Sequence, residues 1–314
     1  MQRDALFVLL NRSPDAVWVV TPNLRLAREL AREYDASQLG QGLDRWTTPR
    51  VVPFSTLIAE LFDSIVHAPP AGSARFPLSS AQERVLWQRA VDEADHALLA
   101  PAAGAQLASD AWRLSYEWRI HRRLHAYPTG VDGQAFMQWA RAYEASTEAL
   151  GATDLARLPD RIEPSLQQGQ GKLPERLILA GFAEPNPQQR GVFDALAARG
   201  VLIESLAAPV TVTTPVRVVA FDAHDEIVRI ADWVSARLRT HPQARIGVVA
   251  PNLAAHKSAL ARALDAVLTP DRLLMPSDAG VRPYNISLGD PLALQPIVAA
   301  QLRLLRLSAG EIPF

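Results

Sequence analysis

The residues placed where an NTPase holds its phosphates follow a short apolar run near the N-terminus, Val17–Val20. A phosphate-binding loop there would read G-x-x-x-x-G-K-[ST], because its glycines let backbone N–H groups wrap the phosphates and its lysine reaches the outer ones. This turn has no glycine and no lysine, and it contains Pro22. We predict a vestigial nucleotide site whose remaining residues are Thr21, Asn23, Arg25, Arg28 and, after a later strand, Glu184.

The second element of an NTPase site is also missing. Magnesium is normally held by an acid at the end of a strand, but the apolar run from residue 177 reaches Ala180 and Gly181 at that point. Phosphoryl transfer depends on positioning and electrostatics, so losing both elements should abolish hydrolysis. We expect no catalytic residue and no cofactor. An NTPase with a degenerate site, using Arg25 or Arg28 with Glu184, remains the alternative.

The sequence gives little support for a metal site. It has no cysteine, which excludes disulfides and thiolate ligands within the chain. His121 and His125 have the i, i+4 spacing of a zinc-binding pair, but two arginines separate them and no glutamate follows His121. A cluster of acids at a strand-to-helix junction suits helix capping better than magnesium: Asp222, Asp225 and Glu226. We expect no bound metal.

The segment Trp112–Tyr127 has the composition of a nucleic-acid contact, with four arginines, two histidines and one acid. We expect one helix from about Ala105 to Leu124, with Arg119, Arg122 and Arg123 on a face beside its aromatic stripe. Arginines beside aromatic rings suit phosphate contacts and base stacking. The alternative is an ordinary solvated basic face. The predicted DNA-binding residues are Arg113, Trp118, Arg119, Arg122 and Arg123.

Hydrophobic patterning predicts an α/β fold around these residues. Apolar runs typical of strands alternate with helical patterns at both ends of the chain, and a nearly all-helical stretch lies between them. The expected strands are 17–20, 50–54, 176–182, 201–206, 216–221 and 245–250, and we expect a loop over 159–174. The pattern Val-Val-x-Pro-Asn-Leu of residues 19–24 recurs at 248–253, as a duplicated unit or as a favourable turn used twice.

Composition limits the classes of protein to which the chain can belong. Its 314 residues are 48% hydrophobic and 21% charged with a net charge of −1, as in a globular protein of more than one domain. A nucleic-acid contact would therefore need a local patch of charge. No apolar run is long enough to span a membrane, and the N-terminus does not resemble a signal peptide. We expect a cytoplasmic protein without a membrane partner.

Several short motifs, in order and spacing, resemble the N-terminal part of AddB-like DNA repair proteins, a family of inactivated superfamily 1 helicases related to RecB-type exonucleases. The motifs are Val20–Arg28, Trp46–Pro49, Leu78–Glu83 with Leu86–Trp87, Ala180–Phe182 with Pro187–Gln189, Arg245–Leu253, Tyr284–Gly289 and Pro291–Ala293. The resemblance implies a RecA-like, P-loop-type 1A domain over 1–75 and 172–212. It further implies a helical 1B-like insertion over 76–171 and part of a 2A-like domain over 213–314.

The resemblance also implies a function in DNA repair and recombination. In the family, the chain continues into a nuclease domain, so no nuclease residue can be assigned here. We expect a non-catalytic helicase-like module that binds DNA, most readily single-stranded, and contacts a helicase–nuclease partner subunit. A protein-interaction scaffold without a DNA contact is the other alternative. Replacing Arg119, Arg122 and Arg123 by alanine should weaken a salt-sensitive DNA contact.

Overall fold

Residues 2–66, 76–94, 98–126, 130–207, 214–271, 282–289 and 291–310 are described by a computed structural model. The chain divides into two units, residues 1–211 and 212–314. Each unit has a hydrophobic core of its own. Residues 67–75, whose two prolines and glycine are typical of a linker, lie outside the described residues. The predicted domain ranges stay predictions.

The first unit is built on a four-stranded parallel sheet with the order β2-β1-β5-β6. Its strands are β1 (Val17–Thr21), β2 (Arg50–Pro53), β5 (Arg176–Ala180) and β6 (Leu202–Leu206). The chain runs outward from β1 to β2, then returns to the other side of β1 for β5 and β6. This confirms the predicted α/β class with a parallel sheet, and it places a change of winding direction between β1 and β5.

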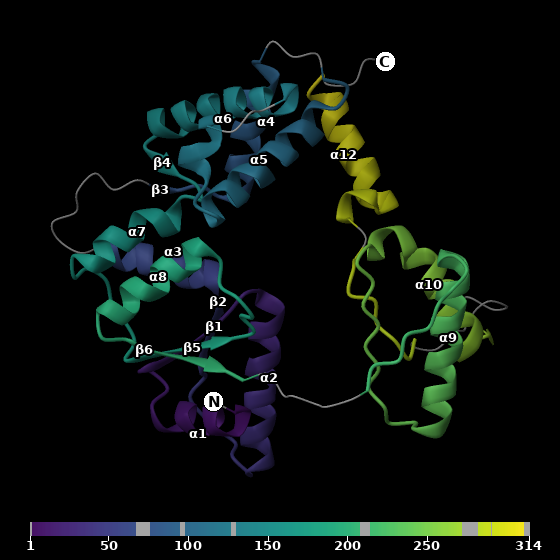
Figure 1. Cartoon of the computed structure of the whole chain (residues 1–314). Coiled ribbons are helices and arrows are strands. Elements are labelled where there is room, and N and C mark those ends of the chain that lie inside the picture. The colour runs from purple at the N-terminus through teal and green to yellow at the C-terminus, as the bar shows by residue number, and fades with distance from the viewer. Residues whose placement is uncertain are drawn as a thin grey trace. The chain divides into compact units, whose positions relative to one another are not determined.

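Helices cover both faces of this sheet (Figure 1), because successive strand side chains point to opposite sides. Val17 and Val19 pack with α1 (Arg3–Arg12) and α2 (Leu24–Gly40). Trp18 and Val20 pack on the other side, with α3 (Phe54–Val66), α7 (Leu158–Gln167) and α8 (Pro187–Ala198). The result is a three-layer arrangement in which all five residues of β1 are buried.

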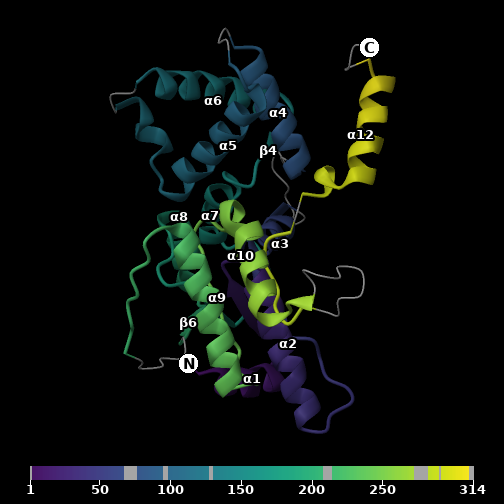
Figure 2. The ribbon, with the colours of Figure 1, turned by 90° about the vertical axis from the view of Figure 1, so that its right-hand side faces the viewer.

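A helical subdomain lies between β2 and β5 in sequence and consists of α4 (Ser80–Asp92), α5 (Pro101–Glu117) and α6 (Val131–Ala149) (Figure 2). Its core is aromatic: the rings of Trp87 and Tyr143 stack at 4.1 Å, and Trp112 meets Trp87 edge-on at 5.8 Å. The prediction of an all-helical insertion needs one correction. The two ends of the insertion meet in a short parallel pair, β3 (Phe76–Pro77) and β4 (Ala152–Thr153).

The loop predicted over 159–174 is wrong in its first part, because α7 occupies Leu158–Gln167. Pro159 lies in the first turn, where a missing N–H costs no helical hydrogen bond. Leu158, Ile162 and Leu166 recur every four residues and are buried in the core beside the sheet. That packing stabilises a helix whose second proline, Pro164, would otherwise disfavour it.

The helix predicted to reach Leu124 ends at Glu117. Arg119 follows in the left-handed region, with φ 55°, and Ile120 N donates back to Ser115 O at 2.8 Å. A separate 3-10 turn, η1 (His121–Ala126), comes next. Arg119, Arg122 and Arg123 therefore do not share the face of one helix, contrary to the prediction.

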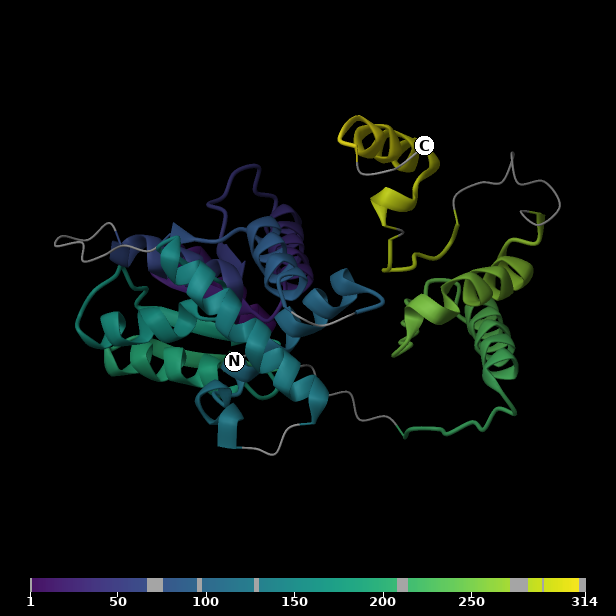
Figure 3. The same cartoon turned by 90° about the horizontal axis from the view of Figure 1, so that it is seen from above.

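The second unit contains α9 (Ala223–Thr240) and α10 (Leu253–Leu268), which pack on each other (Figure 3), followed by η2 (Leu292–Leu294) and α12 (Pro296–Ser308). The expectation of a second α/β domain is wrong for the described part of this unit, which contains no strand. Val216, Phe221 and Val249 of the expected strands are 85%, 95% and 92% exposed. An apolar run forms a strand only where a neighbouring strand accepts its backbone hydrogen bonds.

The repeated Val-Val-x-Pro-Asn-Leu pattern folds differently in its two positions. Asn23 caps α2 by accepting a hydrogen bond from Leu26 N at 2.9 Å, directly after β1. Asn252 precedes α10 without a side-chain capping bond, and no strand leads into it. Within the described ranges, every helix is too short or too polar to traverse a bilayer.

Candidate functional site

The residues predicted as a vestigial nucleotide site serve the turn between β1 and α2. Thr21 is fully buried, and its hydroxyl donates to Asn23 O at 2.8 Å. The Asn23 side chain caps α2. Arg25, Arg28 and Glu184 are exposed. The structure thus brings Thr21 and Asn23 together, with their polar groups turned to local backbone atoms.

The carboxyl edge of the sheet between β1 and β5 is closed by side chains. In doubly wound sheets, ligands bind in the crevice at this reversal of strand order. Here Gly181, at φ +81°, directly follows β5 and lies against the β1–α2 turn. A Cβ atom added to Gly181 would clash with the Leu26 side chain and lie 3.5 Å from Pro22 Cδ. The space beside the turn is filled by Leu26.

The acidic cluster before α9 caps that helix, as predicted. Asp222 accepts a hydrogen bond from Asp225 N at 2.8 Å. Asp225 accepts from Phe221 N and from Arg229 Nε, both at 2.8 Å. The Phe221 N–H and Arg229 hold the pKa of Asp225 below its usual value. In the described part of the chain, no three histidine or carboxylate groups come together as a metal site would require.

Two of the predicted DNA-binding arginines are held by carboxylates. Arg113 pairs with Glu117 at 2.9 Å and with Asp110 at 3.5 Å, and Arg119 pairs with Glu163 of α7. Arg122 and Arg123 are exposed on η1. Trp118 is 59% exposed just after α5. The five predicted residues are thus dispersed, and Arg122 alone among them lines the large cavity beside η1.

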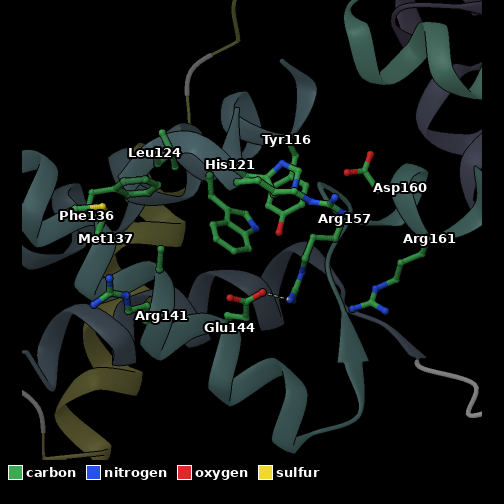
Figure 4. A pocket seen from close by; sticks show the side chains of 13 residues that line it. Tyr116, His121, Leu124, Phe136, Met137, Arg141, Glu144, Arg157, Asp160 and Arg161 are labelled. Carbon is green, nitrogen blue, oxygen red and sulfur yellow. Dashed lines mark ion pairs between the residues drawn. The ribbon is translucent and has the colours of Figure 1, made fainter. Parts of the chain in front are cut away.

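This cavity, which we call the insertion pocket, has a volume of about 550 Å³ and lies among α5, η1, α6 and the start of α7 (Figure 4). Trp112 and Tyr116 on its wall are buried. It is lined by Trp112, Tyr116, His121, Arg122, Leu124, Phe136, Met137, Ala140, Arg141, Glu144, Arg157, Asp160 and Arg161. The volume falls in the range typical of small-molecule sites.

A rigidly held guanidinium is the main polar group of the insertion pocket. Arg157 is 4% exposed, and its Nε donates to Asp154 Oδ2 at 2.8 Å. Its Nη2 donates to Thr147 Oγ1 at 2.6 Å. Trp112 Nε1 donates to the same Asp154 oxygen at 3.2 Å. The whole network is buried, so the position of Arg157 is fixed before any ligand arrives.

The third edge of this guanidinium has no hydrogen bond within the described residues. Arg157 Nη1 is buried without an acceptor, and its nearest carboxylate oxygen, Glu144 Oε1, is 3.9 Å away. The two groups form an ion pair at this distance, but they are too far apart for a hydrogen bond. Because a buried donor without a partner costs free energy, an acceptor that reached Nη1 would be stabilised there.

The pocket is positively charged around a neutral aromatic pair. His121 and Tyr116 stack at 4.0 Å with an interplanar angle of 8°. Burial lowers the pKa of His121 and raises the pKa of Tyr116 to about 12, so both rings are neutral near pH 7. Four arginines line the cavity: Arg122, Arg141, Arg157 and Arg161. They outnumber the lining carboxylates, Glu144 and Asp160, together with Asp154 behind Arg157, so a net positive charge remains.

Figure 4 shows that the insertion pocket has two unlike ends. Leu124, Phe136 and Met137 gather at one end, and Arg157, Asp160 and Arg161 at the other, with the His121–Tyr116 pair nearer the polar end. A ligand with a planar apolar part and an anionic part matches this division. Nucleotides have both parts.

Most residues of the insertion pocket were missed from the sequence. Arg157, Asp160 and Arg161 lie on or before α7, which the proline-containing pattern disguised as a loop. One usable signal existed on α6, where Met137, Arg141 and Glu144 follow at spacings that share a helix face. The residues across the cavity lie on other helices and turns between Trp112 and Arg161, so helical spacing alone could not join them.

No protein-family model and no curated protein matches this chain.

Proposed function

We propose that this chain is a non-catalytic, helicase-like module of an AddB-like DNA repair exonuclease and that it binds single-stranded DNA through the insertion pocket. The observation that supports this most directly is the pocket itself, where arginines and aromatic rings line one cavity. Arginines provide the salt-sensitive attraction to phosphates, and aromatic and apolar walls accept bases of any sequence.

The sheet supports the non-catalytic part of the proposal. Its parallel order and its β1–α2 turn have the plan of a nucleotide-binding domain. The turn lacks the glycines and lysine of a phosphate loop, and Leu26 fills the space beside it. On this proposal, the sheet belongs to a RecA-like domain, and the chain contacts a helicase–nuclease partner subunit in the cytoplasm.

The test compares two double variants of equal charge change by fluorescence anisotropy with a labelled single-stranded oligonucleotide. Arg122→Ala/Arg141→Ala removes two pocket arginines without an ion pair among the described residues. Arg113→Ala/Arg119→Ala removes two arginines that are already ion-paired. We expect the first pair to weaken binding and to reduce the slope of log affinity against log salt by about 1.4, from about 0.7 per phosphate contact.

The control pair should leave the affinity and its salt slope close to those of the wild type. Thermal melting of each variant checks that the fold is intact. The proposal is contradicted if the wild type binds no single-stranded DNA at low salt, or if both pairs weaken binding equally.

A scaffold that docks a partner protein is the second candidate, because α5 and the residue after it carry exposed apolar side chains. Leu107 and Leu114 on α5 are 70% and 46% exposed, seven residues apart on one side of the helix, and Trp118 directly after α5 is 59% exposed. Trp118→Ala tests whether this apolar surface takes part in DNA binding. Loss of DNA affinity in this variant would place the surface in the DNA site, whereas unchanged affinity leaves it free for a protein.

A further inference from the structure

We propose that the insertion pocket holds the phosphorylated end of a DNA strand, with the terminal phosphomonoester at Arg157 and the base at the apolar end. This inference rests on the proposed function, since it names the part of a single strand that the pocket takes. It follows from the free donor on Arg157, the division of the pocket into two ends, and its size.

The polar end supplies a fixed donor to an anion. Asp154 and Thr147 hold two edges of the Arg157 guanidinium at 2.8 and 2.6 Å, so the position of Nη1 is fixed. Nη1 is buried in this conformation, so an anion reaches it once the Glu144 side chain moves aside. Arg157 is almost wholly buried, with 4% of its surface exposed. A charge-assisted hydrogen bond in such a site is stronger than one at the surface.

The apolar end suits a base. Leu124, Phe136 and Met137 come from η1 and α6 and lie together away from Arg157 (Figure 4). Arg141 lies next to Met137 and gives this end a cation without an ion pair in the described residues. A base that moves from water into this end of the pocket gains favourable apolar contacts, and this holds for all four bases.

The size and chemistry of the site favour a strand end over an internal stretch. A cavity of about 550 Å³ is of small-molecule size, and α5, η1, α6 and the start of α7 line it. A phosphomonoester has three terminal oxygens and a charge of about −1.5 to −2 at pH 7. An internal phosphodiester has one negative charge and needs room for chain on both sides. Several arginines around one buried donor therefore fit the monoester better.

Glu144 sets the selectivity of the polar end. Its carboxylate is about half exposed and lies 3.9 Å from Arg157 Nη1, so it attracts the guanidinium but does not satisfy it. An arriving phosphate repels this carboxylate and displaces it toward solvent. Asp160 also lies at this end, where it accepts a hydrogen bond from Gln188 Nε2 at 2.9 Å. The phosphate must therefore gain more from Arg157 than it loses to these two carboxylates.

The experiment uses the full chain and one oligonucleotide sequence with a 5′-phosphate, a 3′-phosphate, or hydroxyls at both ends, each labelled internally. We expect one phosphorylated form to bind about tenfold more tightly than the hydroxyl form, the change that one added charge-assisted hydrogen bond gives. The form that responds identifies the end that enters the pocket. A circular strand of the same length should bind like the hydroxyl form.

Two variants test the residues. Glu144→Gln removes the repulsion and should increase the preference for the phosphorylated strand. Arg157→Lys keeps the charge but loses Nη1 and should abolish the preference, while Arg113→Lys, at an arginine already paired with Asp110 and Glu117, should not change it. If Arg157→Lys melts early, Glu144→Gln still decides the question.

Equal affinities for the three linear forms, with a Glu144→Gln variant that discriminates no better, would overturn this inference. Single-strand binding itself would then stand, and the pocket would hold an internal part of the strand. Absence of binding to every oligonucleotide would instead overturn the proposed function.

Discussion

At the residue scale, Gly181 determines how closely two turns of the sheet approach each other. Its φ of +81° lies in the region that disfavours any side chain. The turn after β1 packs against it through Leu26 and Pro22. A phosphate-binding turn also uses glycine, but there the free space is taken by the ligand, whereas here it is taken by Leu26.

Gly181→Ala should lower the free energy of unfolding by about 1 to 2 kcal/mol, because a Cβ atom is strained at this φ and displaces Leu26. Urea denaturation followed by tryptophan fluorescence measures the change. The matched control is Gly40→Ala at the end of α2, where nothing lies within 4 Å of an added Cβ. It should be neutral or stabilising. Equal stability of Gly181→Ala and the wild type would contradict the close packing.

At the element scale, α4 joins the helical subdomain to the segment before α7. Ser79 and Gln82 form a capping box at its first turn. Glu83 accepts a hydrogen bond from Leu155 N at 3.1 Å, across 72 residues of sequence. Burial raises the pKa of Glu83, although the Leu155 N–H opposes the shift. The helix therefore carries a carboxylate that is more easily protonated in the folded state than in the unfolded one.

This shift gives the stability a pH dependence of known sign. A carboxyl group with a raised pKa contributes most below its unfolded pKa, and the contribution is lost as pH rises through its folded pKa. Glu83→Gln keeps an oxygen for Leu155 N but cannot ionise. The stability of the variant relative to the wild type should therefore increase from about pH 4 to about pH 7. Urea midpoints across this range measure it, and a constant difference would exclude Glu83 as the titrating group.

Local pattern predicted the strands of the first sheet, because a strand covered on both faces is apolar at successive positions, as in Val17–Val20 and 177–180. It failed where a distant residue decided the outcome. Arg119 breaks the helix in a left-handed conformation and pairs with Glu163, 44 residues away. Two prolines hid α7, whose buried leucines and isoleucine reach the sheet core only in the folded chain.

The candidate site shows the same limit. Arg122 was predicted, because it lies in a visibly basic segment. Arg157 was not, because a lone arginine near a proline has no local signature. Its importance comes from burial beside Asp154 and Thr147, and burial depends on tertiary packing. The strands expected at 216–221 and 245–250 failed for a related reason, since a strand requires a neighbour that no local pattern guarantees.

At the scale of the whole molecule, each of the two units has its own core. Three clusters of buried residues lie in residues 1–211, and a separate one joins α9 and α10. The sheet, the helical subdomain and the insertion pocket all belong to the first unit. This division allows the two parts to be separated by experiment.

A chain of residues 1–211 should fold alone and keep the single-strand affinity of the full chain, because it contains a complete core and the whole insertion pocket. Circular dichroism with thermal melting tests folding, and anisotropy tests binding. A folded fragment with much weaker binding would show that residues 212–314 contribute to the DNA contact.

The buried network around Arg157 also acts as a joint. Thr147 belongs to α6 of the helical subdomain, Asp154 follows β4, and α7, which begins directly after Arg157, packs against the sheet. The Arg157 guanidinium thus connects α6 and the segment after β4 to the start of α7, where the chain returns from the insertion to the sheet. A strand end bound at Arg157 would add contacts to this joint. DNA binding should therefore stiffen the connection between the helical subdomain and the sheet.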